Sequence, residues 1–271
     1  MEKQKLIVKI TDGFGNQLFQ YAAGYSVAKK NNMKLYLDIS EYKKKNFRKY
    51  ELDKLNITGN YADEKMLHNI NVFTEKSSVY DSQIYNIHSS TLLDGFWQSE
   101  KYFIQYEEEI LEQFTFKNME FLKNDHYFEM LKNCNSVGIH VRTQDYLIPP
   151  DNEIHYVCTP QYYINAVEEI RKVINNPVFF VFSDNLLLAQ KFINNELNYI
   201  LINSANWMED FYLMQNVRHN IIANSSFSWW AAKLNKNIDK LVIAPECWFT
   251  SKSLKDYSDI VPDNWKKVKT Q

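Results

Sequence analysis

The alternation of apolar strands with helical segments in the second half of the chain constrains its fold more than any other feature. Five short runs are almost continuously apolar, and they cover residues 136–142, 177–183, 198–203, 220–223 and 240–245. Segments with helical character separate them, at 160–176, 186–197, 207–219 and 226–237. Apolar strands that alternate with helices are typical of a parallel sheet covered on both faces. The second half is therefore predicted to be an α/β domain.

The beginning of the chain predicts a second unit of the same kind. We expect a strand, a glycine-containing turn, a helix and another strand, at residues 5–10, 11–17, 17–32 and 33–40. This order is how an α/β unit begins. Residues 41–130 show no clean period and are expected to form mixed helices and loops.

The length of the chain accommodates two such domains. Its 271 residues contain no internal repeat and no linker rich in proline, glycine or serine. We therefore expect two closely packed domains, an N-terminal one at 1–132 and a C-terminal one at 133–271, with a cleft between them.

Charge and cysteine content exclude several classes of protein. The 31 Lys and Arg residues nearly balance the 33 Asp and Glu residues, which argues against a nucleic-acid-binding protein that works through a general basic field. Cys134, Cys158 and Cys247 have no C-x-x-C spacing, so they favour neither a disulfide framework nor a zinc site. No segment resembles a signal peptide or approaches the roughly 20 apolar residues of a membrane-spanning helix. We therefore expect a cytoplasmic protein.

Polar clusters follow four of the predicted strands or precede the helices after them. They are TDGFGNQ (11–17), HVRTQDY (140–146), FSDN (182–185) and ANSSFSWW (223–230). In open parallel sheets, ligands bind just beyond the carboxyl ends of the strands. Four such clusters in one chain predict a binding site.

The cluster HVRTQDY contains three candidate functional residues. The planar guanidinium of Arg142 is suited to phosphate oxygens, although an interdomain salt bridge with Asp145 is an equal alternative. His140 shares a strand face with Arg142, and it either orients a ligand or satisfies a buried hydrogen bond. Asp145 is a candidate general base or a structural acceptor for nearby N–H groups.

The serine block and the glycine turn each precede a predicted helix. Ser225 or Ser226 is expected to cap a helix whose first N–H groups would suit a phosphate, with simple capping as the alternative. Gly13 and Gly15 permit close approach of a ligand to the backbone, and Asn16 is a candidate helix cap. The turn resembles the dinucleotide-binding motif G-x-G-x-x-G, but its third glycine is missing. No lysine of a P-loop motif follows the glycines, and no spacing of His and Asp residues indicates a metal site.

Six segments, in this order, resemble the α-1,2-fucosyltransferases of glycosyltransferase family 11, in particular bacterial members. They are GFGNQLFQYA (13–22), DGFWQSEKYF (94–103), HVRTQDY, FFVFSDN (179–185), NIIANSSFSWWAAKLN (220–235) and VIAPECWF (242–249). The resemblance extends over nearly the whole chain, and its first and fifth segments are long enough to be highly specific.

The resemblance implies a GT-B-like α/β fold with two Rossmann-like domains. It also implies an inverting, metal-independent hexosyltransferase that needs no cofactor and moves L-fucose from GDP-L-fucose to the 2-hydroxyl of a galactose or related sugar. The glycan acceptor would belong to polysaccharide biosynthesis, and lipid-linked acceptors would bring the enzyme to the inner face of the cell membrane. Alternatives are a transferase for another GDP-linked deoxysugar, a non-catalytic glycan- or nucleotide-binding relative, and an NAD-dependent oxidoreductase.

The chain departs from the family pattern His-x-Arg-Arg-Gly-Asp-Tyr at two positions. It keeps His140, Arg142, Asp145 and Tyr146, and it has Thr143 and Gln144 in place of the second arginine and the glycine. Because successive residues of a strand face opposite ways, we expect Thr143 not to share the contact of Arg142 with the donor diphosphate. Asp12 stands where a glycine is common and adds a carboxylate on the acceptor side.

The resemblance and the residue chemistry together predict these roles. Catalytic residues are Arg142, Asp145, His140 and Asp12. Donor-binding residues are Arg142, Asp184, Asn185, Ser225, Ser226, Phe227, Gly13, Gly15 and Asn16, with Asp184 and Asn185 reading the guanine or ribose. Acceptor-side residues are Gln17 and His155. The candidates for the general base are Asp145, Asp12 and His155, in that order.

Overall fold

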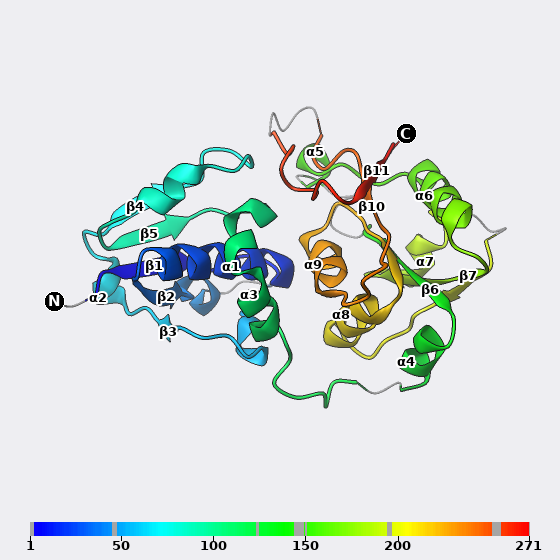
Figure 1. Ribbon diagram of the computed structural model, residues 1–271, viewed down its shortest axis with the longest axis horizontal. Coiled ribbons are helices and arrows are strands. Elements are labelled where there is room, and N and C mark those ends of the chain that lie inside the picture. The colour runs from blue at the N-terminus through cyan, green and yellow to red at the C-terminus, as the bar shows by residue number, and fades with distance from the viewer. Residues whose placement is uncertain are drawn as a thin grey trace. The chain divides into compact units, whose positions relative to one another are not determined.

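The computed structural model describes residues 3–44, 48–122, 125–143, 149, 151–193, 197–250 and 256–270. The chain forms two compact α/β units, one of residues 1–118 with 256–262 and one of residues 119–255 with 263–271 (Figure 1). The predicted boundary after residue 132 is too late, because helix α4 (Asp125–Lys132) contacts strand β6 and helix α8 of the second unit.

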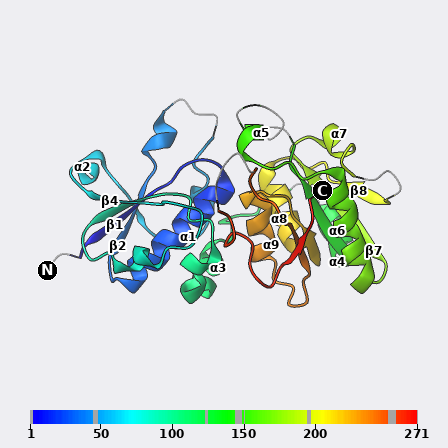
Figure 2. The ribbon, with the colours of Figure 1, turned by 90° about the horizontal axis from the view of Figure 1, so that it is seen from above.

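The first unit is built on five parallel strands in the order β3-β2-β1-β5-β4. The strands are β1 (Lys5–Lys9), β2 (Lys34–Asp38), β3 (Asn60–Tyr61), β4 (Asn71–Thr74) and β5 (Thr91–Asp94). Helix α1 (Phe14–Lys30) packs against β1 and β2 (Figures 1 and 2). A Cβ atom on Gly24 of α1 would lie 2.1 Å from Cγ2 of Val8, so only glycine allows this close approach of helix and sheet.

Short elements complete the first unit. They are α2 (Glu64–Leu67), α3 (Glu107–Gln113) and the 3-10 helices η1 (Ser40–Lys43), η2 (Leu52–Lys54), η3 (Ser82–Asn86), η4 (Glu100–Tyr102) and η5 (Ile104–Tyr106). The prediction of helices and loops over 41–130 missed the strands β3, β4 and β5. These strands have two to four residues each and are partly exposed, so they are too short to show a period of two.

The second unit is built on six parallel strands in the order β11-β10-β9-β6-β7-β8, which confirms the predicted parallel sheet. They are β6 (Asn135–Val141), β7 (Pro177–Ser183), β8 (Tyr199–Leu201), β9 (His219–Ile221), β10 (Val242–Pro245) and β11 (Lys266–Val268). The helices are α4, α5 (Asp151–Ile154), α6 (Pro160–Val173), α7 (Leu186–Ala189), α8 (Trp207–Asn216) and α9 (Ser226–Leu234).

The core of the second unit lies on both faces of its sheet. Val137 and Ile139 of β6 are fully buried and belong to one cluster with Ala166 of α6. The next residue, His140, faces the other side of the sheet and contacts Phe227 of α9. Helices α8 and α9 pack against each other on that second face (Figure 1).

Several predicted element ends differ from the structure. Helix α1 begins at Phe14 with Gly13 as its N-cap, so Asn16 is not the predicted cap. The helix predicted over 186–197 is only the short α7 followed by turns as far as residue 193. Strand β11 was not predicted because its three residues include two lysines. Among the described residues, none of the helices is long and apolar enough to cross a membrane.

Candidate active-site residues

The order of the strands in the second unit brings three of the predicted clusters to one edge. The chain runs from β6 through β7 to β8 on one side, and β9 then returns to pair with the other side of β6. Such a switch in strand order leaves a crevice beyond the carboxyl ends of the strands. Arg142 follows β6, Asp184 follows β7 and Asn224 lies shortly after β9.

The register of β6 and β7 places Arg142 beside Asp184. Their pairing ends at Val141 opposite Ser183, so the next residue on each strand is Arg142 and Asp184. Nη1 of Arg142 lies 3.4 Å from Oδ2 of Asp184, and the exposed fractions of the two side chains are 20% and 15%. The guanidinium is therefore held in place while part of it reaches solvent.

Thr143 contacts the same carboxylate as Arg142. Its backbone N–H and its hydroxyl both lie 3.2 Å from Oδ1 of Asp184, and Thr143 is fully buried. The expectation that Thr143 does not share the donor contact of Arg142 stays a prediction, whereas toward the protein both residues contact Asp184. Strand β6 ends at Val141, and the alternation of side chains ends with it.

His140 is an uncharged member of the site at neutral pH. It is 4% exposed, and its ring centroid lies 5.8 Å from that of Phe227. Burial, together with the nearby charge of Arg142, lowers the pKa of His140 to about 4. Its Nδ1 atom has no hydrogen-bond partner among the residues that the structure describes. His140 can therefore orient a ligand through a hydrogen bond, but it does not supply a positive charge.

The N-terminus of α9 is a candidate site for an anion. Ser225 occupies the N-cap position, but its side chain makes no capping hydrogen bond, so the alternative of simple capping is not observed. The first N–H groups of an α-helix have no partner within the helix and carry partial positive charge. Ser226 and Phe227, which are half-buried, begin this first turn.

Asn224 is a positioning residue that sequence reasoning missed. It is 1% exposed, and its amide donates to the carbonyl oxygens of Tyr156 at 2.5 Å and Trp248 at 2.8 Å. These bonds fix the turn that leads into α9. They also occupy the amide nitrogen, so Asn224 of the Asn-Ser-Ser glycosylation sequence at 224–226 is not accessible for glycosylation in the folded protein. The sequence did offer one indication, because Asn224 lies in segment 220–235, one of the two segments whose resemblance to family 11 is highly specific.

Two further predicted residues have visible structural partners. Oδ1 of Asn185 accepts the N–H of Leu188 at 3.0 Å and thereby caps α7. His155 forms an isolated antiparallel bridge with Phe249, and the centroids of their rings lie 5.5 Å apart. Their roles toward donor and acceptor stay predictions. Asp145 lies outside the described residues.

The glycine turn of the first unit holds Asp12 as a fixed carboxylate. Asp12 has φ 64°, in the left-handed region that favours glycine, which explains why glycine suits this position. Its Oδ1 accepts the N–H of Gly13 at 2.7 Å, and its Oδ2 accepts the side-chain amide of Asn16 at 2.8 Å. Nε of Arg48 lies 3.8 Å from Oδ1. The side chain is 44% exposed, so Asp12 is held but accessible.

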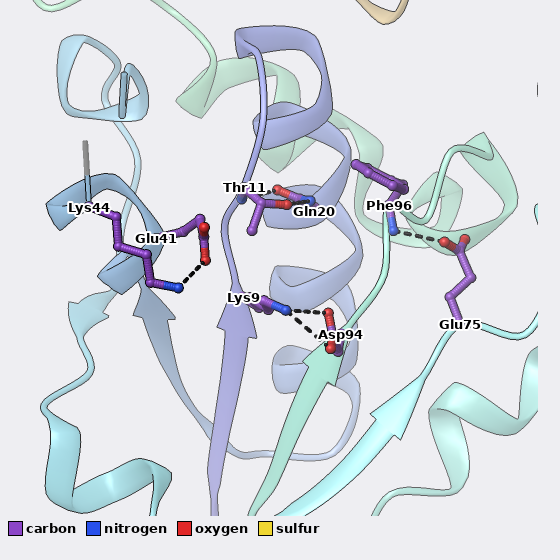
Figure 3. Close-up of polar contacts among 8 residues, drawn as sticks. All are labelled: Lys9, Thr11, Gln20, Glu41, Lys44, Glu75, Asp94 and Phe96. Atoms are coloured by element: carbon purple, nitrogen blue, oxygen red, sulfur yellow. Dashed lines mark hydrogen bonds and ion pairs between the residues drawn. The ribbon is translucent and has the colours of Figure 1, made fainter. Parts of the chain in front are cut away.

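Strand order also creates a switch in the first unit, between β1 and β5. Gln98, which follows β5, donates to Oδ1 of Asn16 at 2.7 Å and so joins the two strand ends. Gln20 holds the start of the same turn through two hydrogen bonds with Thr11, at 2.9 and 3.0 Å (Figure 3). Gly13 and Gly15 lie at the start of α1. Sequence reasoning missed Gln98 and Gln20.

The side chain of Gln17 forms hydrogen bonds to the backbone of the first unit. It is fully buried, and its amide donates to the carbonyl oxygens of Asp12 at 2.9 Å and Lys49 at 2.8 Å. Its Oε1 accepts the N–H of Glu51 at 2.9 Å. The acceptor role of Gln17 stays a prediction, and this geometry argues against it because no polar atom of the side chain faces solvent.

The sequence profile described as Glycosyl transferase family 11 matches residues 2–269. The chain belongs to this family. It is 34% identical to an alpha-1,2-colitosyltransferase of Escherichia coli, over 97% of this chain and 98% of that protein. It is 28% identical to the O-antigen biosynthesis glycosyltransferase WbnK of Escherichia coli, over 94% of this chain and 98% of that protein. The resemblance to family 11 is confirmed, and the oxidoreductase alternative is excluded.

The fold of this family 11 glycosyltransferase is similar to that of two solved fucosyltransferases. The NodZ fucosyltransferase of Bradyrhizobium has a TM-score of 0.54 at 13% identity, over 86% of this chain and 94% of that one. FUT1 of Arabidopsis thaliana, solved as a mutant in complex with GDP, has a TM-score of 0.55 at 12% identity, over 98% of this chain and 76% of that one. These likenesses support the GT-B-like fold with two Rossmann-like domains that the sequence predicts.

The family 11 chain has no group of three or more His, Cys, Asp or Glu side chains that could hold a metal ion, as far as the described residues extend. Metal-independent transfer nevertheless stays a prediction. Within the described part of the second unit, the guanidinium of Arg142 and the N-terminus of α9 supply positive charge at the strand ends.

Proposed function

We propose that this glycosyltransferase moves L-fucose from GDP-L-fucose to the 2-hydroxyl of a galactose or related sugar, with inversion and without a metal. The observation that carries the proposal is the pairing of Arg142 with Asp184 at the strand-order switch of a Rossmann-like unit. A preorganised guanidinium at this place is suited to the diphosphate of a nucleotide sugar.

Departure of GDP places negative charge on the β-phosphate. Arg142 and the first N–H groups of α9 would stabilise this charge, and both are held before the reaction begins. Asp184 and Thr143 fix the end of β6, and Asn224 fixes the turn before α9. Donors that need no rearrangement stabilise a transition state more effectively than mobile ones.

The acceptor hydroxyl must lose a proton during or after its attack. Asp145 remains the first candidate for the general base and Asp12 the second. Asp12 is supported by its accessible carboxylate, which Gly13 and Asn16 hold in one orientation. A carboxylate that accepts two hydrogen bonds retains lone pairs for a third. His155 is the third candidate.

Colitose is a second candidate for the transferred sugar. Two observations favour it: the relative of 34% identity is an alpha-1,2-colitosyltransferase, and Thr143 replaces the usual arginine. Colitose lacks the 3-hydroxyl group of L-fucose. An enzyme discriminates strongly against loss of a hydroxyl only if its site makes a hydrogen bond to that group.

The acceptor is proposed to be a unit of a bacterial surface polysaccharide. The relative WbnK is named for O-antigen biosynthesis, which supports this class of acceptor. A lipid-linked acceptor would bring the protein to the cytoplasmic face of the membrane as a peripheral enzyme.

A donor-by-acceptor screen tests the proposal. GDP-L-fucose, GDP-colitose and UDP-galactose are each combined with galactosides, GDP or UDP release is measured with and without EDTA, and the product linkage is determined by NMR. We expect acceptor-dependent release from one of the GDP-sugars, resistance to EDTA and an α-1,2 linkage. Saturable GDP binding without turnover for any acceptor would instead indicate a non-catalytic binding protein.

A further inference from the structure

The segment DGFWQSEKYF (94–103) has no role in the site described above beyond the contact of Gln98. It begins at Asp94, the last residue of β5, and lies at the carboxyl ends of β4 and β5. Beside it the first unit has a hollow of about 310 Å³. Ligand sites usually enclose roughly 300–1,000 Å³, so this hollow has room for a small ligand.

The walls of the hollow combine aromatic rings with polar groups. The rings are those of Phe73, Tyr80, Trp97 and Tyr102. The centroids of the Tyr80 and Tyr102 rings lie 4.9 Å apart, and those of Trp97 and Tyr102 lie 5.5 Å apart. Glu75, Asp81, Ser77 and Ser82 supply carboxylates and hydroxyls, and Lys76 contributes a single cation.

Trp97 lines the hollow and carries a buried hydrogen-bond donor without a partner among the described residues. Its side chain is fully buried, yet its Nε1 has no hydrogen-bond partner among the residues that the structure describes. A buried indole N–H normally finds a partner, and its absence calls for an explanation. A ligand whose acceptor atom reached Nε1 would satisfy this donor.

The backbone around Trp97 is constrained to present it. Trp97 has φ 56°, a conformation that a tryptophan adopts only under constraint. Glu75 accepts the N–H groups of Phe96 at 2.8 Å and Trp97 at 2.9 Å, and Figure 3 shows the first of these bonds. A Cβ atom on Gly95 would lie 2.4 Å from Cβ of Glu75, so the turn also requires glycine there. Strain of this kind concentrates at functional sites.

We propose that this hollow binds a pyranose ring of the acceptor glycan. A pyranose has an apolar C–H face and a rim of hydroxyls, which matches aromatic walls with polar groups between them. Two carboxylates against one lysine disfavour an anionic ligand. The hydrogen bond from Gln98 to Asn16, whose amide holds Asp12, joins the hollow to the candidate acceptor side. The inference rests on the proposed function, because it assumes that the enzyme uses a glycan acceptor.

The C-terminal return segment supports one wall of the hollow. Oδ2 of Asp259 accepts the backbone N–H of Tyr80 at 2.9 Å, and Oδ1 lies 2.5 Å from Nζ of Lys101. The position of Tyr80 is therefore fixed through its backbone, while its side chain is half-buried and can be changed without opening the core.

Three variants of the full chain test the inference. Tyr80→Ala removes a wall, Trp97→Phe removes the indole N–H and keeps an aromatic ring, and Val72→Ala is the control because Val72 is 54% exposed and does not line the hollow. We expect Tyr80→Ala and Trp97→Phe to raise KM for an oligosaccharide acceptor about tenfold, the loss of roughly one aromatic contact or hydrogen bond. GDP affinity and acceptor-independent donor hydrolysis should stay at the wild-type values, as should every property of Val72→Ala.

Direct binding separates this inference from the proposed function. Saturation-transfer NMR with oligosaccharides reports acceptor binding whether or not transfer occurs, and we expect a signal that the Tyr80→Ala variant loses. If the wild type transfers sugar and both variants keep its acceptor KM, the assignment of the hollow is wrong. If the wild type transfers nothing, the proposed function fails, and the NMR signal of wild type against Tyr80→Ala still decides the hollow. Thermal unfolding within a few degrees of wild type confirms that each variant is folded.

Discussion

Arg142 contributes its positive charge from a fixed position, because Asp184 holds the guanidinium at the end of β6. We predict that Arg142→Ala lowers kcat by a factor on the order of 100 to 1,000, the usual effect of removing one preorganised donor. The side chain is partly exposed, so the fold should stay intact by circular dichroism. Arg142→Lys keeps the charge without the planar fork and should recover only part of the rate. Activity of the alanine variant within a few-fold of wild type would refute the role.

Thr143 is linked to Arg142 through the same carboxylate. Its hydroxyl donates to Oδ1 of Asp184, and loss of a hydrogen bond to a charged group costs about 1.5–3 kcal/mol. We predict that Thr143→Val, which keeps the shape and removes the hydroxyl, weakens GDP binding about tenfold or more in isothermal titration calorimetry. Thr143→Ser keeps the hydroxyl and serves as the matched control, with near wild-type affinity. Equal affinity of the valine and serine variants would show that the hydroxyl has no part in positioning Arg142.

At the scale of elements, the first unit depends on the close packing of α1 on β1. A Cβ atom at Gly24 would overlap Val8, whereas a Cβ atom at Gly13 would meet nothing closer than 3.9 Å. We predict that Gly24→Ala lowers the free energy of unfolding by about 1–3 kcal/mol, the usual cost of overpacking. Gly13→Ser is the control for stability, because serine is favoured at an N-cap. Urea unfolding followed by circular dichroism measures both, and an unchanged midpoint for Gly24→Ala would contradict the packing.

Strand register is a second property of elements with a direct consequence for the site. The parallel pairing of β6 and β7 ends at Val141 and Ser183, and this register alone brings Arg142 and Asp184 together. A shift of one residue would turn every side chain of β7 to the opposite face. The buried residues on both faces of these strands fix this register, and through it they maintain the ion pair as well as the core.

At the scale of the whole molecule, two buried groups make stability depend on pH in opposite directions. Burial raises the pKa of Asp210 to about 7, and the neighbouring Glu209 adds to the effect. The folded protein therefore loses stability as pH rises from about 3.8, the ordinary pKa of the carboxyl, through about 7. Burial lowers the pKa of His140, so that group costs stability as pH falls from about 6.5 to about 4.

The Asp210→Asn variant tests the first of these effects. Asparagine cannot ionise, so the variant avoids the loss of stability that wild type suffers between pH 4 and 7. The difference in free energy of unfolding, variant minus wild type, should therefore be about 1–4 kcal/mol larger at pH 8 than at pH 4. Thermal or urea unfolding at pH 4, 6 and 8 measures this difference. A stability difference that is the same at all three pH values would contradict the raised pKa.

Much of the fold could be predicted from local patterns. The strands β1, β2, β6 and β7 coincide with apolar runs, because a strand buried on both faces must be apolar at nearly every position. The short strands of the first unit and β11 could not be predicted, because two to four partly exposed residues have no detectable period. Strand pairing in the tertiary fold selects such segments.

The candidate site could be predicted only as a set of residue types near strand ends. By itself the sequence determined the parallel α/β units and the family, and it made Arg142 a candidate donor-binding residue, since apolar periodicity and motif spacing are local properties of the chain. Only the tertiary structure decided that Thr143 and Arg142 share Asp184, which lies 41 residues beyond Thr143. It also decided that the side-chain amide of Gln17 is fully used in hydrogen bonds to the backbone. Finally, it showed that Trp97 lines a hollow and that its Nε1 has no hydrogen-bond partner among the described residues. These facts depend on strand order and register, which bring distant residues together and which no local pattern records.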